Sequence, residues 1–212
     1  MQFDLKLIET DKQISAKILQ ALVPEIDNYL KTSLNELRKI LPSNIKSIIQ
    51  NTPEYNSLIG GQLQFELGIP DPSSSLVNII NIWSTNIKIE YNGPKISNDR
   101  IKASFSVSLI RSDYADVLSS NDALVIDNLR GYSLPWLEWL LLEGNKILVR
   151  KQQVEFGPNK ASRTGNAIMR MSNKSWKVPS EFSGTITNNW ITRAIDNNEN
   201  QIYALLDKVF IS

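Results

Sequence analysis

The residues whose charge and spacing could do chemistry are concentrated in one basic segment, residues 144–180. It holds eight Lys and Arg residues and one acid, Glu155, so its net charge is +7, whereas the 212-residue chain has a net charge of +1. Glycine, serine and asparagine interleave with these cations, as in a binding loop. The pattern predicts an extended basic hairpin loop over residues 157–178 that contacts phosphates or an acidic partner surface. The alternative is a solvated strand edge whose Lys and Arg side chains discourage aggregation. The eight cations are Lys146, Arg150, Lys151, Lys160, Arg163, Arg170, Lys174 and Lys177.

Tryptophans add a second set of candidates for binding a partner. Trp83, Trp136 and Trp139 lie in apolar helical patterns and are predicted to be core residues. Trp176 and Trp190 have little apolar sequence around them, which favours an interface role and core packing equally. The predicted partner or DNA interface therefore consists of Lys160, Arg163, Arg170, Lys174, Trp176, Lys177 and Trp190.

Composition removes much catalytic chemistry. The chain has no cysteine and no histidine, which excludes a Cys nucleophile, a Ser-His-Asp triad and a Cys/His zinc site. Carboxylates form near pairs at Asp113/Asp116 and Glu138/Glu143, but a helix cap and an exposed helix face explain them better than a glycosidase or nuclease pair. We therefore predict no enzyme activity and no catalytic, metal, cofactor or small-molecule site. A carboxylate-dependent hydrolase stays the alternative if two acids share a cleft.

The first residues of the chain read as a strand. Residues 2–8 alternate apolar and polar types, with Phe3, Leu5 and Leu7 on one face. This stretch lacks the basic and apolar regions of a secretory signal, so we expect no export by that route. The longest apolar run is far shorter than the roughly 20 residues that cross a bilayer, and we expect no membrane association.

A helical arm follows over residues 10–51. Thr10 and Gln13 have the spacing of a capping box, and from Leu19 onward apolar residues recur with the period of an α-helix. Because proline removes a backbone donor and clashes with the preceding turn, Pro24 and Pro42 predict breaks. The arm is thus expected in pieces.

The remainder indicates an α+β fold with a mainly antiparallel sheet flanked by short helices. We predict a hairpin of residues 87–91 and 101–110 turning at Asn92-Gly93-Pro94, further strands at 124–126, 147–149 and 154–156, and a C-terminal helix at 190–209. Short helices are expected after Pro53 and Pro72, around 112–118 and from Pro135. The chain is expected to be a single domain, with residues 52–156 and 179–212 forming its core.

The order of these elements resembles the neck and tail-completion connector proteins of long-tailed bacteriophages. Five strings carry the resemblance and are similar to segments of virion structural proteins of marine and cyanobacterial phages. They are Asn51-Thr-Pro-Glu-Tyr55, Gly61-Gln-Leu-Gln-Phe-Glu-Leu-Gly-Ile69, Leu134-Pro-Trp-Leu-Glu-Trp-Leu-Leu-Leu142, Val154-Glu-Phe-Gly-Pro158 and Phe182-Ser-Gly-Thr-Ile-Thr-Asn-Asn-Trp-Ile-Thr-Arg-Ala-Ile195.

The resemblance implies a non-enzymatic virion subunit, made in the cytoplasm of a bacterial host. It would form a sixfold or twelvefold homo-oligomeric ring in the neck or proximal tail, around the path of the DNA. Its neighbours would be neck, portal or tail proteins, or the DNA backbone in the lumen. The alternatives are another tail or baseplate structural protein, and a nucleic-acid-associated module that uses the basic segment.

Overall fold

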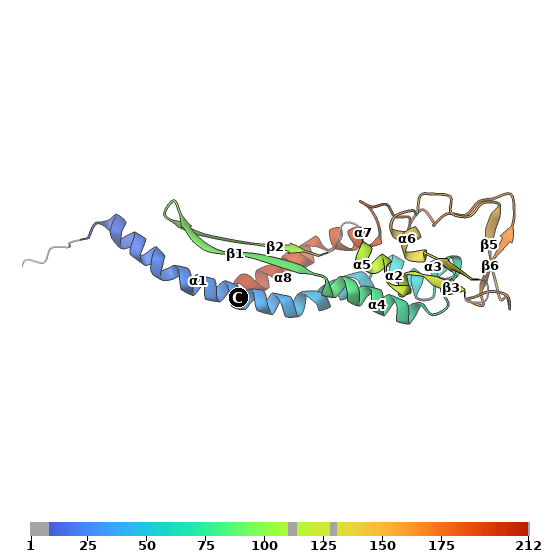
Figure 1. Ribbon diagram of the computed structural model, residues 1–212, viewed down its shortest axis with the longest axis horizontal. Helices are drawn as coiled ribbons and strands as arrows, with labels where there is room; N and C mark the ends of the chain where they lie inside the picture. The colour runs from blue at the N-terminus through green and yellow to red at the C-terminus, as the bar shows by residue number, and fades with distance from the viewer. Residues whose placement is uncertain (1–8, 110–113, 128–130, 212) are drawn as a thin grey trace, which may run out of the picture. The chain divides into compact units, whose positions relative to one another are not determined.

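The computed structural model describes residues 9–109, 114–127 and 131–211. It has a long N-terminal helix, three two-stranded antiparallel sheets, short helices and a C-terminal helix (Figure 1), so the predicted α+β class is confirmed. The chain forms two compact units. Unit 1 comprises Met1–Ile40, Lys88–Ser108 and Leu205–Ser212, and unit 2 comprises Leu41–Ile87 and Leu109–Ala204. No described helix combines the length and apolar character needed to span a membrane.

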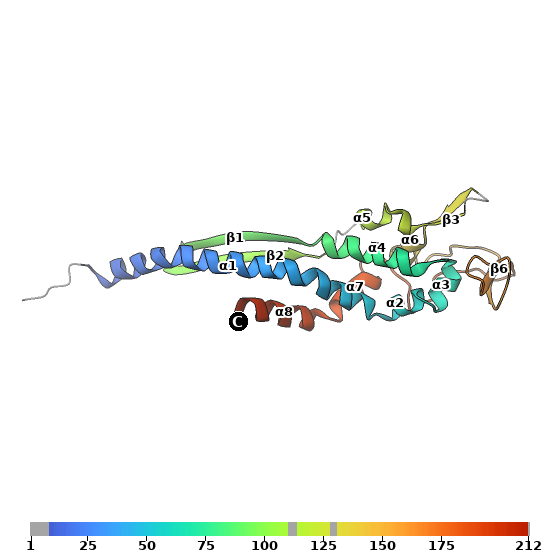
Figure 2. The same ribbon diagram turned by 90° about the horizontal axis from the view of Figure 1, so that it is seen from below.

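Unit 1 is built on the first 30 residues of helix α1 (Asp11–Gln50), which lie beside one long hairpin (Figure 2). Strands β1 (Lys88–Ser97) and β2 (Arg100–Ser108) pair antiparallel. The end of helix α8 (Glu199–Ile211) completes the unit. All three parts come from distant stretches of sequence, so only tertiary contacts hold them together.

Aromatic side chains make those contacts in unit 1. The Tyr91 hydroxyl donates to the Asp27 carboxylate at 2.8 Å, joining the hairpin to α1. The rings of Phe105 and Phe210 stack with centroids 4.6 Å apart, joining the hairpin to α8. The Tyr29 hydroxyl donates to the Phe210 carbonyl at 2.9 Å, which closes the triangle.

The long helix corrects the predicted fragmentation of the arm. Helix α1 runs unbroken through Pro24 and Pro42, where we expected breaks. Around Pro42 the helix keeps an apolar stripe fully buried, including Leu37, Leu41 and Ile45. Because each buried side chain contributes roughly 1.5–3 kcal/mol, the stripe offsets the roughly 3 kcal/mol cost of an internal proline.

The hairpin is confirmed, but its predicted turn is wrong. The chain reverses at Asn98 and Asp99, whose φ angles are +51° and +56°, a conformation that these two residue types tolerate in tight turns. Gly93 and Pro94 instead lie in a bulge, where the register shifts between Asn92 and Lys95. The missing N–H of Pro94 fits this unpaired position.

Unit 2 has a helical core. The last turns of α1 pack with short helices α2 (Pro53–Leu58), α3 (Gln62–Leu67) and α4 (Pro72–Thr85), whose apolar faces are buried. The sequence did not indicate α3. Helix α6 (Trp136–Leu141) adds Trp136, which is fully buried.

Further short elements surround this core. They are α5 (Ala115–Leu118), a 3₁₀ turn (Asn121–Ala123), β3 (Val125–Asp127), β4 (Tyr132–Leu134), β5 (Gln152–Phe156), β6 (Ala167–Met171) and α7 (Trp190–Asp196). The expected single sheet is instead three separate pairs, β1-β2, β3-β4 and β5-β6. The predicted C-terminal helix is divided between α7 and α8 at Asn197 and Asn198, where helix-capping side chains compete with the helical backbone.

Three other predicted features are not among the elements that the structure describes. Residues 147–149 do not form a strand and make one isolated bridge, Val149 to Trp176. The expected strand at 2–8 and the predicted cap Asp113 lie outside the described residues.

Candidate interaction surface

The basic segment folds around the β5–β6 hairpin. These strands pair from Gln152 opposite Met171 to Phe156 opposite Ala167. Beyond them, the Gly157 amide donates to the Asn166 carbonyl at 2.8 Å, which extends the ladder by one step. The predicted basic loop is therefore a strand pair with a connecting loop of residues 157–166, followed by an irregular return.

Hydrogen bonds inside the connecting loop hold it in shape. The Ser162 hydroxyl accepts from the amides of Thr164 at 3.2 Å and Ala167 at 3.4 Å. The Asn159 side chain accepts from the Ala161 amide at 2.9 Å. These bonds place Arg163, whose guanidinium carbon lies 5.9 Å from the centroid of the Tyr132 ring, within cation–π range.

The structure exposes every predicted cation of the interface: Lys160, Arg163, Arg170, Lys174 and Lys177. Arg170 forms an ion pair with Glu155 across the β5–β6 ladder, and both side chains are more than half exposed. Such an exposed pair contributes little to stability. The remaining cations of the segment are also exposed, so its positive charge faces solvent.

The two tryptophans predicted at the interface are buried. Trp190 is fully buried, packs edge-to-face on Trp83 with centroids 5.4 Å apart, and donates its indole N–H to Thr52 at 2.7 Å. Trp176 is 8% exposed and donates to Glu66 at 2.9 Å. Trp190 is therefore a core residue of unit 2, whereas Trp176, largely buried, also lines a groove of that unit. Both find partners more than 100 residues away, which local composition could not reveal.

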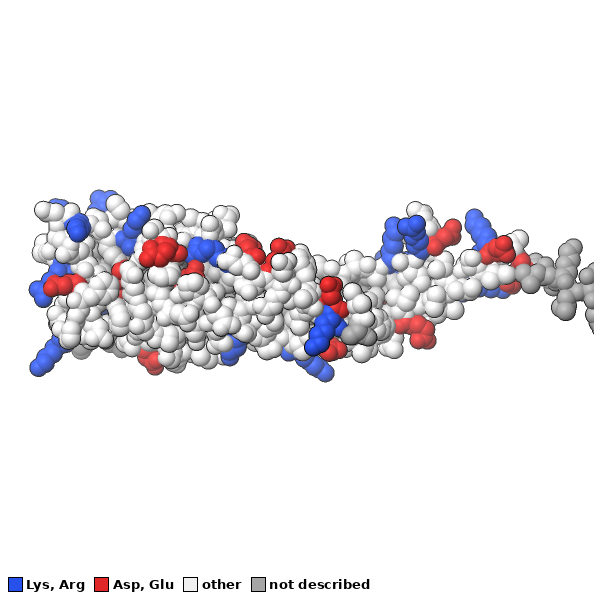
Figure 3. Space-filling view, turned by 180° about the vertical axis from the view of Figure 1, so that it is seen from behind, with Lys and Arg blue, Asp and Glu red and all other residues white. Residues whose placement is uncertain are grey.

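Exposed apolar side chains accompany the cations, and sequence reasoning missed them. Ile147, Phe156 and Met171 are 59%, 53% and 86% exposed, and all three belong to the basic segment. Figure 3 shows blue Lys and Arg side chains between white ones at the end of unit 2 that carries β5 and β6. No sequence signal marked Phe156, because alternation puts it on the same face of β5 as Val154, which is half-buried.

A groove of about 840 Å³ lies beside the hairpin, within unit 2. Its walls come from α3, the β3–β4 pair and the β5–β6 hairpin with its loop, and Figure 1 shows these elements gathered together. Aromatic residues Phe65, Tyr132, Trp139 and Trp176 line it. Trp139 and Trp176 meet edge-to-face with centroids 6.2 Å apart, and Trp139 is half-buried rather than part of the fully buried core.

Charged groups in the groove are few. Arg163 lines it and forms no ion pair with any described residue. The Glu66 carboxylate accepts from the Trp176 indole N–H at 2.9 Å and from the side-chain amide of Gln62 at 2.7 Å, so both its oxygens are engaged. Asp127 also lines the groove. Among the described residues that line the groove, the arrangement offers an aromatic surface with one available cation.

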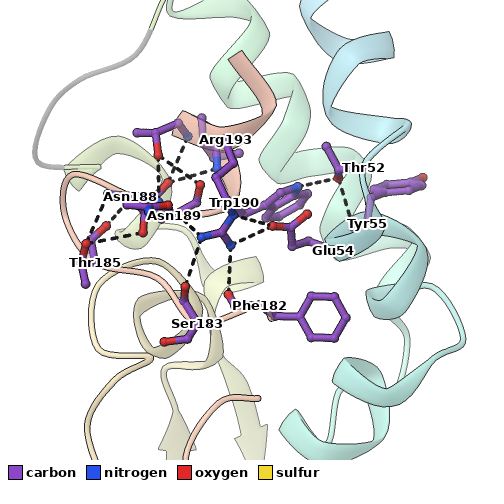
Figure 4. Close-up of polar contacts among 12 residues, drawn as sticks. Thr52, Glu54, Tyr55, Phe182, Ser183, Thr185, Asn188, Asn189, Trp190 and Arg193 are labelled. Carbon is purple, nitrogen blue, oxygen red and sulfur yellow. Dashed lines mark hydrogen bonds and ion pairs between the residues drawn. The ribbon is translucent and has the colours of Figure 1, made fainter. Parts of the chain in front are cut away.

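The most elaborate polar cluster of unit 2 lies elsewhere, around Arg193 (Figure 4). The Arg193 guanidinium donates to one Glu54 oxygen at 2.8 and 3.0 Å, to the carbonyls of Phe182 and Ser183, and to Asn188. The Glu54 side chain is 7% exposed. Because these bonds join α2 and α7 to the loop of residues 182–189, the cluster stabilises the fold of unit 2.

Asn189 adds further buried hydrogen bonds next to the Arg193 cluster. Its buried side chain caps α7 by accepting from the amides of Ile191 and Thr192, while its amide donates to the Tyr114 hydroxyl at 2.8 Å. Burial raises the pKa of Tyr114 above its usual value of 10.0. The neutral phenol is thus the form held in the fold.

The carboxylates considered for catalysis are engaged separately. Asp116 accepts from the Asn86 side chain at 2.6 Å, and Glu143 accepts from Lys146 at 2.7 Å. Neither they nor Glu138 line the groove. Across residues 9–109, 114–127 and 131–211, no three acidic side chains cluster in a way that could hold a metal ion.

Comparison of the chain with protein families, curated proteins and solved structures found no match.

Proposed function

We propose that this protein is a structural subunit of a tailed-phage virion, forming an oligomeric ring at the neck or proximal tail. One observation supports this most strongly. The basic segment presents exposed apolar side chains beside exposed cations, with its loop held in shape by internal hydrogen bonds. The resemblance to connector proteins supplies the biological setting.

The combination of side chains favours a protein partner. A phosphate backbone attracts cations, but it gains nothing from Phe156 or Met171. Protein interfaces are instead enriched in aromatic residues, methionine and arginine. Exposed apolar side chains in a basic segment, such as Phe156 and Met171 at the two ends of the β5–β6 ladder, are therefore of the kind that docks on another protein.

The charge distribution supports association of identical copies. The basic segment carries +7 and the rest of the chain carries −6. A basic segment of one copy is attracted to the acidic remainder of the next, and such head-to-tail contacts close into a ring when the rotation between copies permits. No metal, cofactor or enzymatic step is part of this function.

Charge reversal tests the proposal. The variant Arg163→Glu with Lys174→Glu removes two exposed cations and leaves the buried core untouched. The matched control is Arg100→Glu with Lys102→Glu, which makes the same change in net charge on exposed residues of β2. Light scattering over a range of protein concentrations measures self-association, and circular dichroism checks the fold.

We expect the wild-type protein and the control to associate, and the Arg163/Lys174 variant to stay dissociated while folded. Equal association of all three proteins would show that the basic segment plays no part in self-association. A wild-type chain that stays monomeric but binds DNA with steep salt dependence would favour the nucleic-acid alternative instead.

A further inference from the structure

The loop of residues 157–166 is bonded mainly to itself. The Asn159 amide, for example, donates to the Gly165 carbonyl at 2.9 Å. Among the residues that the structure describes, every hydrogen bond of this loop has its partner within residues 157–167, and none of its side chains forms an ion pair. The loop is therefore a stiff unit that no hydrogen bond ties to the rest of unit 2.

Arg163 makes the polar contact that does reach the rest of unit 2. Its guanidinium carbon lies 5.9 Å from the centroid of the Tyr132 ring. A Cβ built on Gly68 would lie 3.5 Å from the same carbon, so the guanidinium also lies against the backbone at the end of α3. Gly68 has a φ angle of +68°, and a larger side chain there would be strained and would crowd the guanidinium. Tyr132 and Gly68 together form the seat of Arg163.

Held in this seat, the loop closes one side of the groove. Residues 161–164 line the groove together with α3 and Trp139. Ala167, at the base of the loop, also lines it and is 7% exposed. Movement of the loop away from Tyr132 would therefore open the groove.

The ends of the loop have room for such a movement. Gly157 and Gly165 have φ angles of +140° and +82°. A Cβ on either glycine would meet no other atom within 4 Å, so open space surrounds both positions. The loop can therefore change its angle at these two glycines while its internal hydrogen bonds persist.

We propose that residues 157–166 are a lid of the unit 2 groove, and that Arg163 is the latch that keeps the lid closed on Tyr132 and Gly68. Lids of this kind control access to the site beneath them. A cation–π contact of an exposed arginine is weak, so its loss shifts the equilibrium between closed and open lid only about two- to fivefold. The inference goes beyond the proposed ring, because it concerns unit 2 of a single chain.

Thiol labelling tests the lid, because the chain has no cysteine. Ala167→Cys places a thiol beneath the loop in the otherwise full-length chain. We expect a maleimide to label it slowly, and Arg163→Ala to raise the labelling rate about two- to fivefold by populating the open lid. Lys160→Ala makes the same change in charge at an exposed residue of the same loop that does not line the groove, and it should leave the rate unchanged.

Tyr132→Leu removes the seat instead of the latch. We expect the same acceleration at Ala167→Cys, with no further increase when Arg163→Ala is added, because both substitutions remove one shared contact. Ala194→Cys, at a position in α7 that is 2% exposed, reports unfolding of unit 2 and should be labelled equally slowly in every variant.

Two results would overturn the inference. Equal labelling of Ala167→Cys with and without Arg163→Ala would show that Arg163 does not hold the loop closed. Faster labelling of both Ala167→Cys and Ala194→Cys would show that Arg163 supports the whole of unit 2 and not a lid.

Discussion

Arg193 donates two hydrogen bonds, of 2.8 and 3.0 Å, to one carboxylate oxygen of Glu54, which lies 139 residues earlier in the chain. The same guanidinium holds the carbonyls of Phe182 and Ser183. One side chain therefore joins α2, the loop of residues 182–189 and α7. These residues therefore serve the fold of unit 2.

Breaking this buried pair should be costly. Glu54→Gln leaves the Arg193 charge without its partner, and we expect a loss in free energy of unfolding on the order of 3 kcal/mol. Glu155→Gln makes the same change in the exposed Arg170 pair and should cost less than about 1 kcal/mol. Urea denaturation measures both, and equal effects would show that the Arg193 brace is not a main support of unit 2.

Gly184 lies where no side chain fits. A Cβ there would come within 2.3 Å of the Leu140 carbonyl oxygen, a backbone atom that cannot move alone. We expect Gly184→Ala to destabilise unit 2 by roughly 1–3 kcal/mol through overpacking.

Gly93 provides the comparison for this substitution. A Cβ there would meet the Asp27 carboxylate oxygen at 3.3 Å, the end of a side chain that can shift. Thermal denaturation should show a smaller loss for Gly93→Ala. A larger loss for Gly93→Ala than for Gly184→Ala would contradict the packing described around Leu140.

Two tryptophans should differ in their cost of truncation. Trp190→Ala removes a fully buried ring and its bond to Thr52, so we expect a loss of about 3–5 kcal/mol. Trp139 is half-buried in the groove wall, so Trp139→Ala should cost clearly less. Denaturant midpoints measure the difference. A larger loss for Trp139→Ala than for Trp190→Ala would contradict the burial described for these two rings.

Unit 1 should lose stability at alkaline pH through Tyr91. Burial and the bond to Asp27 raise the pKa of Tyr91 to about 12 from 10.0. Between these values the unfolded chain has lost the phenol proton while the folded chain keeps it, so the free energy of unfolding falls as pH rises. Tyr91→Phe should make this fall shallower, measured by urea denaturation at several pH values. Identical slopes would contradict the prediction.

At acid pH the partner of Tyr91 contributes in the opposite direction. Hydrogen bonds from Lys31 and Tyr91 hold the pKa of Asp27 below its usual value of 3.8. The stabilisation is present above that value and is lost as pH falls through the lower, folded-state pKa. Asp27→Asn should therefore reduce the acid dependence of unfolding, and an unchanged acid limb would count against the Asp27–Tyr91 contact.

Sequence patterns predicted the elements whose causes are local. The 3.6-residue period indicated helical structure over residues 10–51, though in pieces, and alternation indicated the β1–β2 hairpin. Local rules failed where distant residues decide the outcome. The helix continues through Pro42 because its stripe is buried. The misplaced hairpin turn is a local error instead: Asn98 and Asp99 form the turn, and Pro94 lies in a bulge.

The candidate interaction surface was predictable in its charge and not in its other features. All five cations assigned to it are exposed, since strongly charged side chains remain in water. Trp176 and Trp190 find buried partners far along the chain, which no local pattern indicates. The aromatic groove depends on three distant segments and was likewise invisible in the sequence.

The most direct test of the proposed function is the number of copies of this chain in a virion. Quantitative mass spectrometry of particles purified from the source of this sequence, referenced to the major capsid protein, measures it without a structural assumption. A ring subunit of the neck or proximal tail predicts six or twelve copies per particle. Absence from the particle, or hundreds of copies, would contradict the proposed function.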